Sequence, residues 1–180
     1  MHPIPCFAFV YCCMLALARR HPCIFGKYTD WIRVQLFFWA TLCSENAWTE
    51  SLIWTNAVGC YFAVQGIYCL TEYRLLDELA ARFFRDNFGF QSSSRAAHVL
   101  ADALVHGLPV LFALGQRTQA PPFRFAWILT SVPHATYAYW VLGSWDPAPL
   151  YRLPPTPKHL VPWIWACVVT GHALAQFILV

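Results

Sequence analysis

The sequence predicts an all-α protein: a polytopic transmembrane helix bundle of about six spans, with one amphipathic helix at the membrane interface. Three observations predict this class: 58% of the 180 residues are hydrophobic, only 12% are charged, and the mean hydropathy is +0.44. An ordinary soluble domain carries about 25% charged residues. The composition therefore excludes an ordinary soluble domain, and the long apolar runs of the chain are expected to lie in lipid.

Six segments of the chain are apolar enough to be predicted as membrane spans, since about 20 helical residues cross roughly 30 Å of hydrocarbon. They comprise residues 3–18, 24–43, 51–70, 96–114, 125–142 and 160–180. Charged residues crowd the start of the second segment, and the first and fifth segments are short. A bundle of four spans with two interfacial segments is therefore the alternative.

Basic residues set the predicted orientation of these spans. If all six cross, the loops after the first, third and fifth carry nine Lys and Arg residues, while the opposite side carries only Arg117 and Arg124. The positive-inside rule then places both termini on the translocated side. The first segment lacks a basic region ahead of it and is followed by Arg19 and Arg20. We therefore expect a retained span and not a cleaved signal.

Two segments outside the predicted spans have a distinct composition. Residues 71–95 place apolar side chains on one side of a helix and charged side chains on the other, which predicts an amphipathic interfacial helix. Its charges are of mixed sign, so docking on a neighbour is favoured over binding to anionic lipid. Residues 145–162 hold six of the thirteen prolines, which predicts an extended loop along the membrane surface or a partner. No repeat or linker divides the chain, so residues 1–180 are expected to form a single integral membrane domain.

The polar residues of the fourth predicted span form a stripe. His98, Asp102 and His106 are spaced four residues apart, so they share one side of a helix. Ionisable groups inside a membrane usually face a cavity, a partner helix or a site. The stripe is open to four interpretations: a proton relay, a metal site, a general base with its orienting acid, or a structural seam of interhelical hydrogen bonds, which is the plainest. His134 and His172 are the other polar residues of interest inside predicted spans.

A metal site needs three or four converging ligands, and the stripe supplies at most two adjacent ones. No spacing demands that His134 and His172 complete such a site, and the eight cysteines contain no C-x-x-C pair. We therefore predict no metal and no cofactor, and we expect bound lipids. The net charge of +3 is small, and no basic cluster is interleaved with aromatic residues, so nucleic acid is excluded as a partner.

Three stretches of the chain carry a resemblance to a known family. They are FGKYTDWIRVQLFF at residues 25–38, LVHGLPVLFAL at residues 104–114 and GSWDPAPLY at residues 143–151. Together they resemble the androgen-induced-gene family of small multi-span membrane proteins, which hydrolyse fatty acid esters of hydroxy fatty acids with an intramembrane threonine and histidine. The resemblance implies that Thr29 is the nucleophile and His106 the base. The chain contains no G-x-S-x-G nucleophile elbow.

Two functions fit these features. The first is an accessory or structural subunit of a larger membrane complex, with membrane lipids and the other integral subunits of a hetero-oligomer as its partners. An energy-converting, respiratory-type complex of the mitochondrial inner membrane is the working example. The alternative is an intramembrane threonine/histidine hydrolase of fatty acid esters in the endoplasmic reticulum membrane. The subunit hypothesis is preferred, because nearly all of the chain lies in predicted spans and no complete catalytic constellation is visible.

Overall fold

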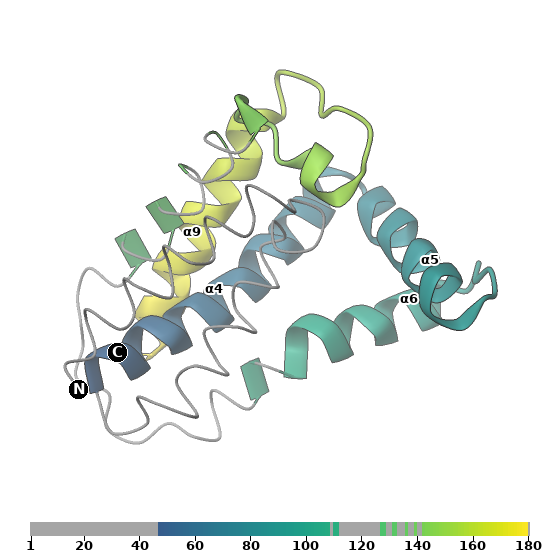
Figure 1. Cartoon of the computed structure of the whole chain (residues 1–180). Helices are drawn as coiled ribbons and strands as arrows, with labels where there is room; N and C mark the ends of the chain where they lie inside the picture. The colour runs from purple at the N-terminus through teal and green to yellow at the C-terminus, as the bar shows by residue number, and fades with distance from the viewer. Residues whose placement is uncertain are drawn as a thin grey trace.

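The computed structural model describes residues 47–108, 110–111, 127–128, 131–132, 136, 139 and 142–179. The regular elements of this part are all helical, with no β-strand among them. In chain order they are α4 (Ala47–Leu70), α5 (Arg74–Phe88), α6 (Arg95–Asp102), the π-helical turn η2 (Ala103–Gly107), the 3₁₀ helix η3 (Ala148–Tyr151) and α9 (Val161–Leu179). Figure 1 shows α4 and α9 side by side, with the α5–α6 hairpin extending from the end of α4.

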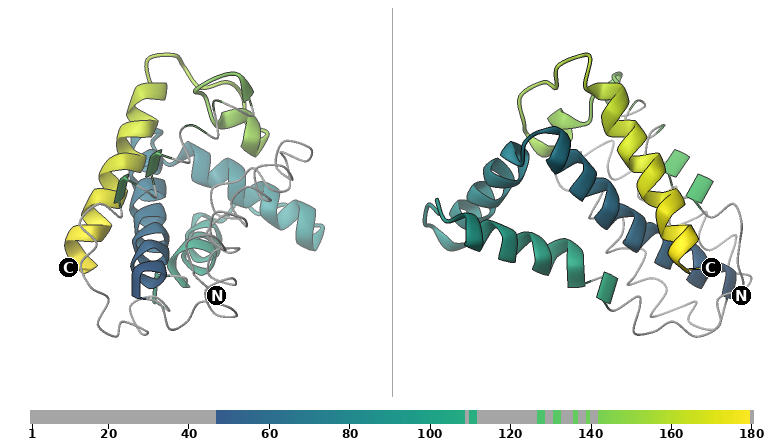
Figure 2. Two further views of the ribbon diagram at one scale, coloured as in Figure 1. Left: turned by 60° about the vertical axis from the view of Figure 1, so that its left-hand side comes forward. Right: turned by 180° about the vertical axis from the view of Figure 1, so that it is seen from behind.

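Small residues let α4 and α9 pack with their backbones in contact. A Cβ atom on Gly171 would lie 2.7 Å from the backbone nitrogen of Ala63 and 2.8 Å from the carbonyl oxygen of Gly59. Gly66 lies farther along the same contact, opposite Cys167. Because later positions of α4 face earlier positions of α9, the two helices run antiparallel, and Figure 2 shows the pair from two further sides. Close approach at small residues is the usual way in which helices associate in an apolar environment.

Among the described residues, one helical segment, Val161–Ile178 of α9, is long and apolar enough to cross a membrane. α4 has 24 residues but is not apolar enough. The predicted span at residues 96–114 does not form one uniform α-helix, because α6 ends after eight residues and the chain continues as η2. The prediction of a bundle of six transmembrane spans is therefore wrong, and so is its four-span alternative.

The error has a physical cause. Composition counts Trp, Tyr, Gly and Cys as compatible with lipid, and these residues are frequent in the predicted span at residues 51–70. In the structure the same segment buries polar side chains such as Thr55 and Asn56, as a core helix does. Which side of a helix is buried is not visible in its average hydropathy. The predicted spans at residues 3–18 and 24–43, and most of 125–142, lie outside the described residues.

α5 is an amphipathic helix bounded by residues in the left-handed region. Tyr73 (φ 61°) precedes it and Gly89 (φ 71°) follows it, so the chain turns sharply at both ends. Leu76 and Ala80 are buried, whereas Phe88 at the end of the helix is exposed. Figure 2 shows α5 projecting away from the α4–α9 pair. The hairpin thereby presents its own surface to the surroundings.

The proline-rich segment after residue 142 is held in place by specific hydrogen bonds. Asp146 accepts from the backbone N–H of Ala148 at 3.0 Å and from that of Thr156 at 2.8 Å. Arg82 of α5 donates to the carbonyl oxygen of Tyr151 at 2.6 Å. Apart from η3 and short turns the segment has no regular secondary structure. These contacts attach the loop to α5 and lead it into the start of α9.

Candidate functional site

The structure divides the predicted polar stripe into two separate clusters. Asp102 and His106 lie together against α4. His98 instead faces α5 and contacts a different carboxylate, that of Asp77. Within the described part of the chain, the hydrogen bonds of His98 and those of the Asp102–His106 pair therefore involve different carboxylates.

The first cluster, called the Asp102 centre, comprises Gln65, Tyr68, Asp102 and His106. His106 Nδ1 and Asp102 Oδ1 are 2.7 Å apart, and Gln65 Nε2 donates to Asp102 Oδ2 at 2.8 Å. The Tyr68 side chain also interacts with this carboxylate and contributes to the shift of its pKa. The Asp102 side chain is 8% exposed and that of His106 is 14% exposed. The centre is therefore a nearly enclosed polar contact between α4 and the α6–η2 segment.

Local helix geometry positions the members of the Asp102 centre. Residues four apart on a helix are neighbours, so Asp102 and His106 meet within one turn. Gln65 and Tyr68 are three residues apart and share one side of α4. His106 lies within the π-helical turn η2. Such turns occur frequently at functional sites, because they shift side chains away from the regular α-helical positions.

Asp102 is ionised at neutral pH. Burial raises the pKa of its carboxyl group, but hydrogen bonds from His106, Gln65 and Tyr68 outweigh burial and hold the pKa below its ordinary value. Burial, followed by the charge of Asp102, raises the pKa of Tyr68, so its phenol remains protonated and donates. The buried carboxylate is therefore hydrogen-bonded by Gln65 and His106, with Tyr68 beside it.

The ionised Asp102 fixes the tautomer of His106. A carboxylate only accepts hydrogen bonds, so His106 Nδ1 carries a proton and donates it to the contact. In a neutral imidazole the free lone pair is then on Nε2. Within the described part of the chain, Asp102 is the one hydrogen-bonding partner of the His106 side chain. The arrangement can therefore take a proton from a group brought to Nε2, and it also ties η2 to α4.

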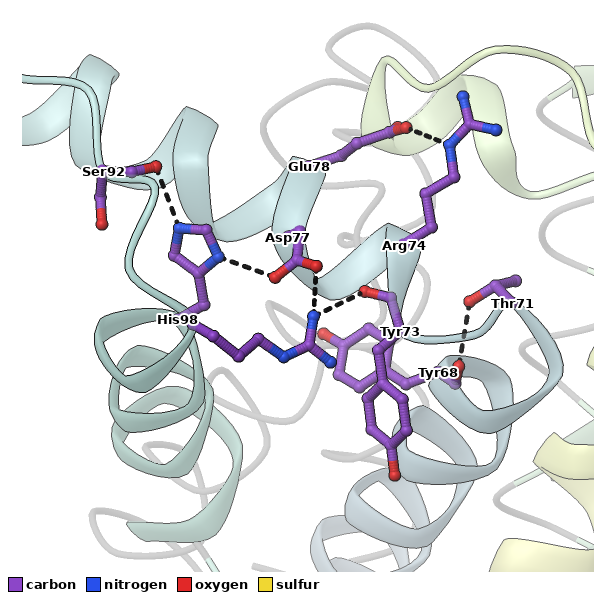
Figure 3. Close-up of polar contacts among 9 residues, drawn as sticks. Tyr68, Thr71, Tyr73, Arg74, Asp77, Glu78, Ser92 and His98 are labelled. Atoms are coloured by element: carbon purple, nitrogen blue, oxygen red, sulfur yellow. Dashed lines mark hydrogen bonds and ion pairs between the residues drawn. The ribbon is translucent and has the colours of Figure 1, made fainter.

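The second cluster joins the two helices of the α5–α6 hairpin, as Figure 3 shows. His98 Nδ1 lies 2.8 Å from Asp77 Oδ1, and His98 Nε2 lies 3.1 Å from the carbonyl oxygen of Ser92. Arg95 donates to the other oxygen of Asp77 and to the carbonyl oxygen of Tyr73. The hydrogen bond with His98 and then the nearby Arg95 hold the pKa of Asp77 below its ordinary value, although slight desolvation opposes them. Through these contacts His98 joins α6 to α5 and to the segment between them.

We expect Asp77→Asn to loosen the α5–α6 hairpin, because a neutral amide is a weaker acceptor than the carboxylate for His98 and Arg95. The folded-state pKa of Asp77 is lowered, so its contribution to stability is present above the ordinary Asp range and is lost as the pH falls through the folded pKa. The amide hydrogens of α5 should be less protected from exchange in the variant than in the wild type at neutral pH. In the wild type, this protection should be lost only in acid. Asp86→Asn is the control, because Asp86 is exposed and contacts only its neighbour Arg85 within the described residues. Equal exchange rates in the two variants would contradict this role of Asp77.

Sequence reasoning missed four side chains of these clusters, namely Gln65, Tyr68, Asp77 and Arg95. Gln65 and Tyr68 lie in a segment predicted as a membrane span, and their one sequence signal is a three-residue spacing on a helix. Asp77 carried no signal, because its partners are 18 and 21 residues away along the chain. Contacts at such separations are decided by how the helices fold back on each other.

The remaining candidate residues are distributed as follows. His172 lies in the α4–α9 contact, beside Asn56. Thr29 and His134 lie outside the described residues. Of the implied pair of Thr29 and His106, the structure therefore describes His106 alone. Among the residues that the structure describes, no three His, Cys, Asp or Glu side chains are placed to hold a metal ion.

Comparisons with protein-family models, with curated proteins and with solved structures find no match to this chain. Its function must therefore be inferred from the arrangement of its own residues.

Proposed function

We propose that this protein is an accessory subunit of a larger membrane complex, with α9 lying in the bilayer. One observation supports this proposal above all: α9 buries two strongly polar side chains, whereas several of its large apolar side chains are exposed. His172 and Gln176 are buried, whereas Phe177 is 83% exposed and Trp163 and Leu174 are exposed as well. A helix on the surface of a soluble protein shows the opposite arrangement.

The inward polar side chains of α9 find partners within the protein. His172 Nδ1 donates to the carbonyl oxygen of Val168 at 2.7 Å, and its Nε2 lies 3.1 Å from the side-chain oxygen of Asn56. Gln176 Oε1 accepts from the backbone nitrogen of Trp127 at 3.1 Å. Polar contacts of this kind hold helices together where the surroundings offer no competing water. They support a helix whose outer side meets lipid or another apolar surface.

Besides the exposed apolar side of α9, a second apolar face extends from α6 through η2 to the next turn. It is called the α6–η2 face. Its large apolar side chains are each more than half exposed: Val99, Leu100, Leu104, Leu108 and Leu111. The last four recur every three or four residues, so they form one stripe. Exposed apolar stripes mark contacts with lipid or with another protein. The α6–η2 face is the proposed contact with a neighbouring integral subunit, and the mitochondrial inner membrane is the location to test first.

The test is the mass of the particle that carries the chain after extraction from its native membrane in mild detergent. We expect a particle well above the 20.6 kDa of the chain, with fixed co-purifying proteins. The double variant Leu104→Gln and Leu111→Gln should release the chain from this particle. The control Arg74→Gln should not, because Arg74 is exposed and contacts only Glu78 in its own helix within the described residues. A monomer or a homo-oligomer of the wild-type chain would overturn the proposal.

One observation favours a second candidate function, the hydrolysis of fatty acid esters in the endoplasmic reticulum membrane. The Asp102 centre supplies an imidazole whose Nδ1 is held by an ionised carboxylate and whose Nε2 is the basic nitrogen. The resemblance implies that His106 takes the proton of the Thr29 hydroxyl as this oxygen attacks the ester carbonyl. The bond to the alcohol then breaks, the alcohol leaves with that proton, and water releases the fatty acid from the acyl-threonine. Asp102 is then a positioning residue that keeps the imidazole in the productive tautomer.

If the protein is such a hydrolase, His106→Ala should lower kcat/KM for a fatty acid ester by about 10²–10⁴-fold, which is the usual contribution of a general base. Thr29→Ala should abolish turnover, since no nucleophile remains. Asp86→Asn is the matched control, because Asp86 is exposed and contacts only its neighbour Arg85 within the described residues. Steady-state assays of the purified protein in detergent or vesicles measure these effects. Turnover that survives unchanged in His106→Ala would remove this candidate function.

A further inference from the structure

The start of α9 carries a group of aromatic and basic side chains that no function so far described uses. This group, called the α9 rim, consists of Tyr139, which precedes the loop, three side chains of the loop and two of the first turns of the helix: Tyr139, Trp145, Arg152, Lys158, Trp163 and Trp165. We propose that the α9 rim binds the phosphate headgroups of the bilayer that α9 enters, with a preference for anionic phospholipid. The proposal rests on the membrane placement of α9 in the proposed function.

Three aromatic side chains of the rim, Tyr139, Trp145 and Trp165, are joined by contacts, and Tyr139, Trp145 and Trp163 are exposed. Trp163 is 60% exposed, and Tyr139 and Trp145 are about half exposed. The rings of Tyr139 and Trp145 stack with their centroids 4.7 Å apart, and Trp165 Nε1 donates to the carbonyl oxygen of Trp145 at 2.7 Å. Indole and phenol rings with an apolar body and a polar edge are enriched where hydrocarbon meets headgroups. Their position at the first turns of α9 places that boundary at the start of the helix.

The basic side chains of the rim have no acidic partner in the described part of the chain. Arg152 and Lys158 are exposed, and neither forms an ion pair with a described residue. Asp146, the acidic residue of the loop, is engaged by the backbone N–H groups of Ala148 and Thr156. The loop therefore presents positive charge outward while its one carboxylate is turned to its own backbone. Anionic groups are the complementary occupant.

The charge pattern along the chain favours a headgroup layer over an acidic soluble partner. The cations precede the helix, whereas residues 161–180 contain no Asp, Glu, Lys or Arg. Leu160 and Ile164 are joined to the preceding residues by helical-type hydrogen bonds of 2.8 Å and 3.0 Å, so the loop leads into α9 without a break. Basic residues followed at once by an uncharged apolar helix, with Trp at the junction, match the order of phosphate, interface and hydrocarbon in a bilayer.

The loop that carries the cations is a fixed scaffold. Leu150 and Leu153 are buried, and Arg82 donates to the carbonyl oxygen of Tyr151 that directly precedes Arg152. Arg152 itself adopts a left-handed conformation (φ 55°) at the end of η3, and its side chain is exposed. A scaffold that is ordered before binding lowers the entropy cost of binding. The rim can therefore bind one phospholipid headgroup in preference to another.

The test uses the full-length chain reconstituted in vesicles of phosphatidylcholine that contain spin-labelled phosphatidylglycerol or spin-labelled phosphatidylcholine. Electron spin resonance measures the fraction of each labelled lipid held at the protein. We expect phosphatidylglycerol to be preferred in the wild type. In the double variant Arg152→Gln and Lys158→Gln, the preference for phosphatidylglycerol over phosphatidylcholine should fall. We expect a decrease of about fivefold for each cation removed, which corresponds to about 1 kcal/mol per basic residue. The control double variant Arg74→Gln and Arg85→Gln should keep it, because these cations lie on α5 and each contacts a neighbouring carboxylate.

The outcomes separate this inference from the proposed function. A chain that floats with the vesicles but shows no preference for phosphatidylglycerol, or keeps its preference in the rim variant, overturns the rim proposal alone. A chain that does not float with vesicles after an alkaline wash overturns the membrane placement of α9 itself. Loss of co-purifying proteins from the rim variant with unchanged lipid preference assigns the rim to an acidic protein partner and also overturns the proposal. All four substituted cations of the two double variants are exposed, so the substitutions should leave the fold unchanged. Circular dichroism of each variant checks that it remains helical.

Discussion

Gly171→Ala is expected to separate α4 from α9 and to destabilise the protein by about 3 kcal/mol, near the upper end of the usual cost of overpacking. The added Cβ atom would lie 2.7 Å from the backbone nitrogen of Ala63 and 2.8 Å from the carbonyl oxygen of Gly59. Both are backbone atoms, so no rotamer change relieves the clash. The two helices must move apart along their whole contact, which also strains the buried contact between Asn56 and His172.

Two other glycines supply graded controls for this variant. A Cβ atom on Gly66 would meet the side chain of Cys167, with the sulfur at 3.1 Å, and a side chain can shift, so Gly66→Ala should cost less. A Cβ atom on Gly107 would meet nothing within 4 Å, so Gly107→Ala should be neutral or slightly stabilising. Thermal unfolding in detergent, followed by circular dichroism, ranks the three variants. Equal stability of Gly171→Ala and Gly107→Ala would contradict the close packing of α4 on α9.

Asp102→Ala is expected to lower the free energy of unfolding by about 3 kcal/mol, because it removes the shared acceptor of a buried polar cluster. Gln65, Tyr68 and His106 each lose their contact with the carboxylate and remain in the contact between α4 and η2. Asp86→Ala serves as the control and should change stability little, because Asp86 is exposed and lies beside Arg85 on the surface. Denaturant unfolding of the two variants in the same detergent measures the difference. A cost for Asp102→Ala no larger than that for Asp86→Ala would contradict the structural role of the centre.

The pH dependence of this stability has a definite sign. The pKa of Asp102 is lowered in the folded protein, so the ionised carboxylate stabilises the fold above the ordinary Asp range. This contribution is lost as the pH falls through the folded pKa and the carboxyl group takes up a proton. The wild type should therefore weaken in acid, while Asp102→Ala should show a flatter profile. The comparison isolates the Asp102 centre from the other carboxylates of the chain.

Asp102→Asn separates the structural role of the centre from the catalytic one. The amide keeps the size of the side chain and one acceptor oxygen, but it loses the charge that holds the proton on His106 Nδ1. If the centre is a structural seam, the variant should be less stable because the carboxylate charge is lost. No enzymatic turnover should then depend on Asp102. If His106 is a base for ester hydrolysis, the variant should keep its fold and lower kcat/KM, with a changed pH–rate profile. A folded Asp102→Asn protein with wild-type turnover would leave Asp102 no role in catalysis.

The sequence by itself determined the features that depend on residues close together along the chain. The helical classes of α5 and α9 follow from their apolar spacing and their length, and Asp102 and His106 meet because they are four residues apart on a helix. The chain has more apolar side chains than its interior can bury, so some of them must remain on the surface. The exposed Phe177 is one of them. These features need no knowledge of how the helices pack.

Only the tertiary structure decided which partner each polar side chain has. Gln65 reaches Asp102 across 37 residues of chain, and His98, which shares the spacing of the stripe, turns instead to Asp77. The turns around α5 bring the hairpin together at that point, and no local periodicity encodes them. The number of membrane spans was also misjudged, because hydropathy sums residue types and does not distinguish a helix that buries its polar side from one that faces lipid. Burial and pairing are properties of packed helices, and they arise only when segments distant in sequence meet.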